Sequence, residues 1–100
     1  MDIPNVALVI TQENGRPQCA IRGEIDIETG PTVGQALASF IAIGETSIDL
    51  DLSQVEFIDS RGIRELIVAR RAGLQMIITA ASPAVRRTFA VAGIDGFLRD

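Results

Sequence analysis

The residues best suited to chemistry lie in the segment VEFIDSRGIREL (Val55–Leu66), where an apolar run gives way to a helical pattern. Asp59 and Ser60 come directly before the apolar positions of that helix. A carboxylate or hydroxyl at a helix start commonly accepts hydrogen bonds from backbone N–H groups that have no partner within the helix. A serine at the same place is also a possible acceptor of a phosphate. The local pattern favours the capping role for Ser60 and leaves the phosphorylation role open.

Gly62 stands inside the first turn of the same predicted helix. Glycine in a helix costs about 0.5–1 kcal/mol relative to alanine, so its presence needs a reason. One reason is the close approach of another molecule's backbone, and the other is tight packing of the turn on the neighbouring strands. Both reasons predict that a side chain at position 62 is poorly tolerated.

The chain lacks the residue types on which most catalytic and metal-dependent sites depend. It contains no histidine, no lysine and a single cysteine. A Ser-His-Asp or Cys-His arrangement and a structural zinc site are therefore impossible, and a phosphate-binding loop ending in Gly-Lys is absent. Asp59 as the phosphate acceptor of a response-regulator receiver is rejected, because that family needs a lysine and an acidic pair. We expect no enzyme activity, no cofactor and no metal.

Composition points to a single small domain, residues 1–100, with a modest aliphatic core. Apolar residues make up 47% of the chain, the formal net charge is −4, and all nine basic residues are arginines. Broad binding to nucleic acid or to an anionic membrane is not expected from that balance. No apolar run approaches the roughly 20 residues of a membrane helix. With one cysteine and no basic leader segment, the sequence predicts a reduced, cytoplasmic protein.

Hydrophobic periodicity and turn residues predict alternating strands and helices. An Asn-Gly pair between the first two strands is typical of a hairpin. Ser82 and Pro83 are expected to cap and to begin the last helix. The predicted strands are 6–12, 18–26, 47–52 with a kinked extension to 58, 75–80 and, as a short fifth strand, 96–100; the predicted helices are 29–44, 60–72 and 82–93.

The predicted fold is α/β, with a mixed, mostly parallel β-sheet, helices packed against it, and the order ββαβαβα(β). Right-handed crossovers join the parallel strands in such folds. Two helices then begin at the same edge of the sheet, where open parallel sheets commonly carry their functional residues. The side chains expected to cluster there are those of Asp26, Glu28, Asp59 and Ser60.

Three segments resemble the STAS domain family, which is named for sulfate transporters and anti-sigma-factor antagonists. The first is IDLDLSQVEFIDSRGIREL (residues 48–66), with a strand ending in Asp-Leu-Ser and an Asp-Ser-x-Gly turn into a helix. The second is GEID (Gly23–Asp26), and the third is AVRRTFAVAGIDGFL (residues 84–98). The resemblance covers nearly the whole chain in the right order, and it implies the STAS fold.

The resemblance implies a function in transcription control through partner switching. In anti-sigma-factor antagonists of this kind, the serine after that aspartate is phosphorylated by the anti-sigma factor, a histidine-kinase-like serine kinase. The unphosphorylated domain binds the anti-sigma factor and frees the sigma factor, and a phosphatase restores binding after phosphorylation. Ser60 matches the phosphorylated position. The predicted partner-binding residues are Asp26, Asp59, Ser60, Arg61, Gly62 and Arg64.

Two departures from the family pattern count against carrying over every property of the family, and other functions stay open beside it. Arg61 stands where the family often has a second Ser or Thr or a small residue, which adds a charge to the contact surface. The chain also stops at the predicted fifth strand, where many relatives continue into another helix. The alternatives are a STAS subunit of another assembly, such as a stressosome or a lipid-transport accessory, or a small-ligand or nucleotide sensor using the same edge.

Overall fold

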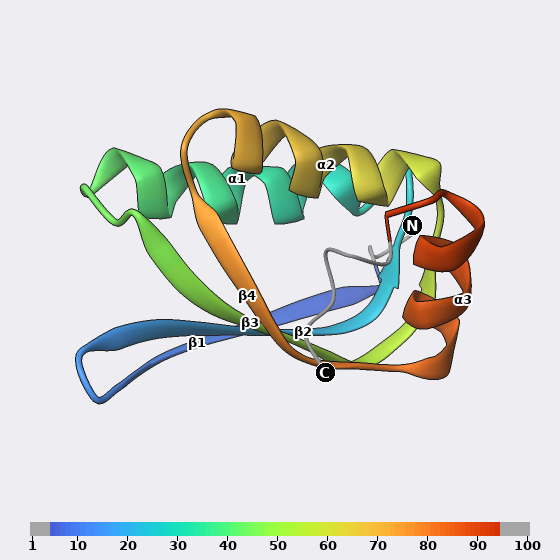
Figure 1. The fold of residues 1–100 in the computed structure, drawn as a ribbon, viewed down its shortest axis with the longest axis horizontal. Helices are drawn as coiled ribbons and strands as arrows, with labels where there is room; N and C mark the ends of the chain where they lie inside the picture. Colours follow the sequence, from blue (N-terminus) through green and yellow to red (C-terminus); the bar gives the residue numbers. More distant parts are fainter. Residues whose placement is uncertain (1–4, 95–100) are drawn as a thin grey trace.

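The structure is a computed structural model, and it describes residues 5–94. Its elements follow the predicted order ββαβαβα (Figure 1). The predicted fifth strand, residues 96–100, lies outside the described residues. The elements are β1 (Val6–Glu13), β2 (Arg16–Ile25), α1 (Gly30–Ala42), β3 (Ser47–Ile58), α2 (Ser60–Arg71), β4 (Gln75–Ala81) and α3 (Pro83–Val91).

The four strands form one sheet in the order β1-β2-β3-β4. β1 pairs with β2 in an antiparallel hairpin whose register runs from Val6 opposite Gly23 to Glu13 opposite Arg16. β2 and β3 are parallel, as are β3 and β4. Asn14 and Gly15 both have positive φ, 54° and 77°, as the tight hairpin turn requires. The prediction of a mixed, mostly parallel sheet is confirmed.

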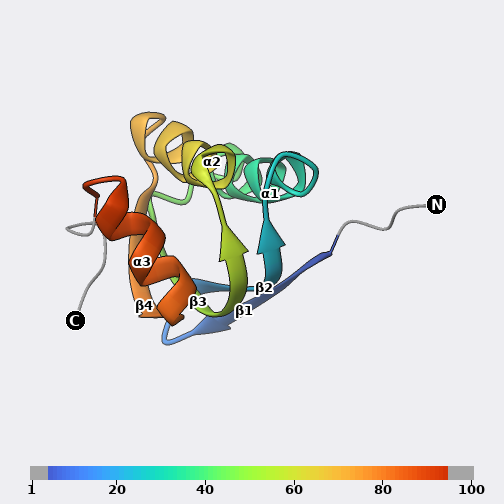
Figure 2. The ribbon, with the colours of Figure 1, turned by 90° about the vertical axis from the view of Figure 1, so that its right-hand side faces the viewer.

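α1 and α2 lie side by side over one face of the sheet, and α3 lies at its β4 side (Figures 1 and 2). α3 packs mainly against β3. Alternate residues of β2 and β3 point into the core beneath α1 and α2, as period-two alternation predicts. None of the helices in residues 5–94 combines the length and apolar character needed to cross a membrane. The fully buried side chains of β2 and β3 are those of Cys19, Ile21, Ile25, Ile48, Leu50, Leu52 and Val55.

β2 and β3 end together, and this places the starts of α1 and α2 on one edge. The last residues paired between the two strands are Ile25 and Ile58. One residue further, the backbone N–H of Asp59 still donates to the carbonyl of Ile25, at 3.3 Å. Asp26 follows Ile25 directly, so Asp26 and Asp59 leave adjacent strands at the same level. The predicted clustering at one edge is confirmed.

Gly62 is buried where the first turn of α2 rests on the ends of β2 and β3. A Cβ atom at this position would lie 2.6 Å from the carbonyl oxygen of Ile25 and 2.9 Å from Cγ1 of Ile58. Neither distance is compatible with normal packing. Of the two explanations that the sequence offered, tight packing of the turn is the one that the structure supports.

We predict that Gly62→Ala destabilises the domain by about 1–3 kcal/mol, because the methyl group must displace the Ile25 backbone or the whole turn. The gain in helix propensity, about 0.5–1 kcal/mol, is too small to compensate. Chemical denaturation measures the difference. Arg64→Ala, an exposed change in the same helix, is the control and should lie within about 0.5 kcal/mol of the unaltered protein. A Gly62→Ala protein of equal or greater stability would refute the packing role.

Candidate functional site

The candidate site is the edge at the ends of β2 and β3, formed by residues 26–29 and 57–64, which we call the rim. It contains the start of α2 and the loop that leads into α1. Ser60 is exposed, and Asp26 and Asp59 are half-buried. The sequence-predicted residues therefore come together at one place.

Asp59, and not Ser60, caps α2. The Asp59 carboxylate accepts hydrogen bonds from the backbone N–H groups of Arg61, at 2.9 Å, and Gly62, at 3.1 Å. Its own carbonyl accepts from the N–H of Ile63 at 3.0 Å. Ser60 is the first helical residue, and its hydroxyl makes no hydrogen bond within residues 5–94. The interpretation of Ser60 as the helix cap is wrong, because the helix begins one residue earlier than that interpretation needs.

Asp26 organises the loop before α1 in a similar way. Its carboxylate accepts from the backbone N–H groups of Glu28, at 2.9 Å, and Thr29, at 3.1 Å. These bonds, the one from Thr29 foremost, hold the pKa of Asp26 below its usual range. The carboxylate is therefore anionic at neutral pH. It loses its charge only below the usual carboxyl range, and its contribution to stability is lost there.

Thr29 occupies the capping position of α1 without capping it through its side chain. Its buried hydroxyl instead donates to the carbonyl of Glu24, at 2.7 Å, and accepts from the N–H of Asp26, at 2.9 Å. The side chain at the start of α1 is thus bonded to the end of β2 and to the loop, and not to the helix. The effect is to tie the end of β2 to the loop that carries Asp26.

Arg61 and Arg64 are exposed on the first turn and a half of α2. Neither guanidinium has a hydrogen-bond or ion-pair partner within residues 5–94. Gly62, by contrast, lies beneath this surface and supports it. Of the six predicted partner-binding residues, five have exposed or half-buried side chains, and Gly62 acts through packing.

Two apolar side chains at the rim were not among the predicted site residues. Ile27 is 59% exposed and Phe57 is 47% exposed. Phe57 faces solvent because it alternates with the buried Ile58, while two register shifts of β3 against β2 bring Val55 inside as well. A signal was present in the sequence, since two successive apolar residues of a strand point to opposite faces. Exposed aromatic and aliphatic side chains beside polar groups are typical of protein contacts.

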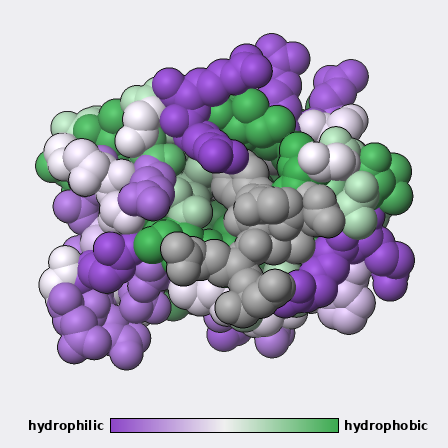
Figure 3. Space-filling view, in the orientation of Figure 1, coloured by the Kyte–Doolittle hydropathy of each residue, from purple (hydrophilic) through white to green (hydrophobic). Residues whose placement is uncertain are grey.

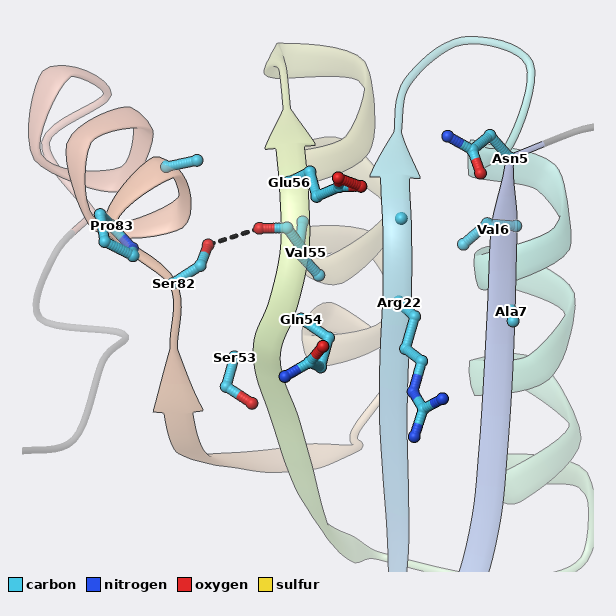
Figure 4. Close-up of a pocket in the computed structure, with 12 residues that line it drawn as sticks. Asn5, Val6, Ala7, Arg22, Ser53, Gln54, Val55, Glu56, Ser82 and Pro83 are labelled. Atoms are coloured by element: carbon cyan, nitrogen blue, oxygen red, sulfur yellow. Dashed lines mark hydrogen bonds between the residues drawn. The ribbon is translucent and has the colours of Figure 1, made fainter.

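A cavity of about 770 Å³ lies elsewhere, between the start of β1, β2 near Gly23, the bulged part of β3 and the start of α3 (Figure 4). The Ser82 hydroxyl there donates to the carbonyl of Val55 at 2.6 Å and accepts from the N–H of Val85 at 3.2 Å, which confirms Ser82 as the cap of α3. None of the six predicted site residues lines the cavity.

Within residues 5–94, no three acidic or thiol side chains are grouped to hold a metal ion.

We predict opposite results for the two adjacent residues at the start of α2. Asp59→Ala should lower the free energy of unfolding by about 0.5–2 kcal/mol, because two backbone N–H groups lose their acceptor. Ser60→Ala should change it by less than about 0.5 kcal/mol, because no hydrogen bond is lost. Urea denaturation of both variants decides the point. A larger loss for Ser60→Ala than for Asp59→Ala would show that the hydroxyl is the cap.

Comparison with known proteins agrees with this geometry. The family model described as "Mlab, STAS domain" matches residues 9–100. The anti-sigma-F factor antagonist RsfB of Mycobacterium tuberculosis is 28% identical over 98 residues, which cover 95% of this chain and 80% of RsfB.

Solved structures show the same fold. The crystal structure of an anti-sigma factor antagonist from Mycobacterium paratuberculosis superimposes with a TM-score of 0.82 at 26% identity, covering 98% of this chain and 87% of that one. The Bacillus cell fate determinant SpoIIAA in its phosphorylated form superimposes with a TM-score of 0.66 at 23% identity, covering 94% and 90%. The family match spans most of the sequence, and its Asp-Ser-x-Gly turn lies at the rim. The chain belongs to the STAS domain family.

Proposed function

We propose that this domain is an anti-sigma-factor antagonist, which binds an anti-sigma factor through the rim and thereby releases a sigma factor. Phosphorylation of Ser60 by the anti-sigma factor ends that binding, and a phosphatase restores it. The relatives described as anti-sigma factor antagonists, similar to this chain over nearly its whole length, support the role. The proposed role is binding and switching in the cytoplasm, and it requires no catalysis by this domain.

The observation that carries the proposal is the free hydroxyl of Ser60. It is exposed at the first position of α2. The hydroxyl has no capping role, because the side chain of Asp59 caps the helix. A kinase is therefore able to reach the hydroxyl, and its modification breaks no bond of the fold. Phosphorylation changes the surface while the packing beneath it, at Gly62, stays the same.

The electrostatic change is large for so small a domain. A phosphoserine carries a charge of about −1.5 to −2 at neutral pH, which takes the formal net charge from −4 to about −5.5 to −6. The new charge appears beside the carboxylates of Asp26 and Asp59. A partner docked over the rim would meet a dianion where it previously met a hydroxyl. We infer that the contact surface consists of Asp26, Ile27, Phe57, Asp59, Ser60, Arg61 and Arg64.

A second candidate function is that of a STAS subunit in another assembly, such as a stressosome or a lipid-transport accessory. It is favoured by the family model, whose description names Mlab and no sigma-factor regulator. This candidate uses the same rim for a different partner. Binding of an anti-sigma factor distinguishes the two candidates, because only the first requires it.

We predict that phosphorylation at Ser60 weakens binding to the cognate anti-sigma factor by about 30- to 1,000-fold. The phosphate would repel an acidic group of the partner: two unit charges 4 Å apart repel by about 4 kcal/mol at an effective dielectric of 20. Salt and relaxation reduce this to about 2–4 kcal/mol, and each 1.4 kcal/mol is about tenfold in affinity. Mass spectrometry after incubation with the anti-sigma factor and ATP locates the phosphate. Titration calorimetry then compares the two forms.

Two serine variants make that experiment specific. Ser60→Ala should bind at near the unaltered affinity and resist switching. Ser53→Ala, which removes an exposed hydroxyl from β3, should bind and switch like the unaltered protein. Equal binding by the phosphorylated and unmodified forms would reject Ser60 as the switch. Absence of any binding to the anti-sigma factor would favour the second candidate function.

We predict that Phe57→Ala weakens anti-sigma-factor binding by about tenfold or more, because exposed aromatic residues at the centre of a contact often contribute most of its energy. The fold should be little affected, since the ring is already 47% exposed. Ile43→Ala, an exposed change at the far end of α1, is the control and should leave binding unaltered. Equal affinity for the Phe57→Ala and Ile43→Ala proteins would remove Phe57 from the contact surface.

A further inference from the structure

The start of α2 offers few free backbone donors to a phosphate on Ser60. A helix start presents four N–H groups without partners inside the helix. Three of them are occupied here: the N–H of Asp59 donates to Ile25, and those of Arg61 and Gly62 donate to the Asp59 carboxylate. The favourable helix N-terminus that usually stabilises a phosphate is thus largely used by the cap.

The charged surroundings of Ser60 are also unfavourable for a phosphate. Asp59 precedes it, and Asp26, whose lowered pKa keeps it ionised, leaves the adjacent strand at the same level. Like charges close together raise the cost of a further negative charge. A dianion at this place is therefore stabilised mainly by a nearby cationic side chain.

Arg64 is placed to supply that cation. It follows Ser60 by four residues in α2, and side chains at i and i+4 lie on the same face with their Cβ atoms about 5–6 Å apart. It is exposed, and its guanidinium has no partner within residues 5–94. An anion one turn before a cation is the favourable orientation in a helix. Arg61 is adjacent in sequence and points to a different side.

We propose that phosphoserine at position 60 pairs with Arg64 within the same molecule. This inference rests on the proposed phosphorylation of Ser60. A guanidinium is well suited to the role, because its planar donors match phosphate oxygens in a two-point contact. The pairing requires a rotamer change of Arg64 and no movement of the backbone.

The pairing alters more of the partner-facing surface than the phosphate alone. Before phosphorylation, Arg61 and Arg64 are both exposed cations on the first turns of α2. In the space-filling view, hydrophilic side chains lie along the upper edge of the molecule, where α2 runs (Figure 3). After phosphorylation, Arg64 is held by the phosphate and is withdrawn from any acidic group of the partner. One modification thus adds negative charge and removes a cation from the contact surface.

The test is a phosphorus-31 NMR titration of the full chain carrying phosphoserine at position 60, installed during translation. The second pKa of a phosphoserine is ordinarily about 6. Arg64→Gln should raise the second pKa by about 0.15–0.4 of a pH unit relative to the protein with Arg64, because the dianion loses its partner. Arg64→Lys should keep part of the effect. Salt at about 1 M should abolish the difference through screening.

Arg71→Gln is the control, since Arg71 is an exposed arginine at the far end of the same helix. The second pKa of its phosphoserine should equal that of the phosphorylated protein without substitutions. If Arg64→Gln leaves the second pKa unchanged while circular dichroism shows an intact fold, the pairing is refuted. The titration uses neither kinase nor anti-sigma factor, so its failure is separate from failure of the proposed function. A shifted pKa together with equal partner binding by both forms would keep the pairing and reject the switch.

Discussion

The contact between Gly62 and the end of β2 is the constraint on which the rim depends. With no side chain at position 62, the first turn of α2 rests directly on the carbonyl of Ile25. That same carbonyl accepts the N–H of Asp59, so the strand ladder continues one residue into the helix cap. Because β2 and β3 are parallel, this contact brings the start of α2 beside the loop that begins at Asp26. The predicted surface exists because two strand ends and a helix start meet without an intervening side chain.

Two adjacent residues at that place have separate tasks. Asp59 satisfies the backbone donors of α2, and Ser60 is left with an exposed hydroxyl that the fold does not use. A regulatory modification benefits from this separation, since a capping serine would have to exchange a structural bond for a phosphate. The Asp59 cap also occupies backbone donors that would otherwise stabilise a phosphate. A phosphate on Ser60 therefore depends more on the arginine side chains of α2. Stability and switching are thus assigned to neighbouring side chains.

The sequence predicted the fold well because its signals are local and strong. Alternation in SIDLDL, the Asn-Gly turn and the Ser-Pro start of α3 each specify one element, and parallel pairing then brings Asp26 and Ser60 to one edge. The choice of cap could not be predicted, because Asp59 and Ser60 are both good capping residues and a shift of one residue exchanges them. The predicted fifth strand falls on residues that the structure does not describe.

The burial of Val55 was also beyond the sequence. It depends on register shifts between β2 and β3, and each such bulge reverses the alternation of the residues that follow it. The bond between Thr29 and Glu24 was missed for a related reason, since a threonine at a helix start has several possible partners within reach. In both cases tertiary geometry selected one of several locally acceptable arrangements.

The central claim is that the rim is the surface where a partner binds and where phosphorylation acts. The most direct measurement is a nitrogen-15 NMR titration of the labelled domain with its cognate anti-sigma factor, before and after phosphorylation of Ser60. Our account predicts that the first titration perturbs the backbone signals of residues 26–29 and 57–64 most strongly. After phosphorylation, the same additions should leave those signals almost unchanged. Perturbations centred on the cavity near Gly23 and Ser82, or equal perturbations in both forms, would contradict the account.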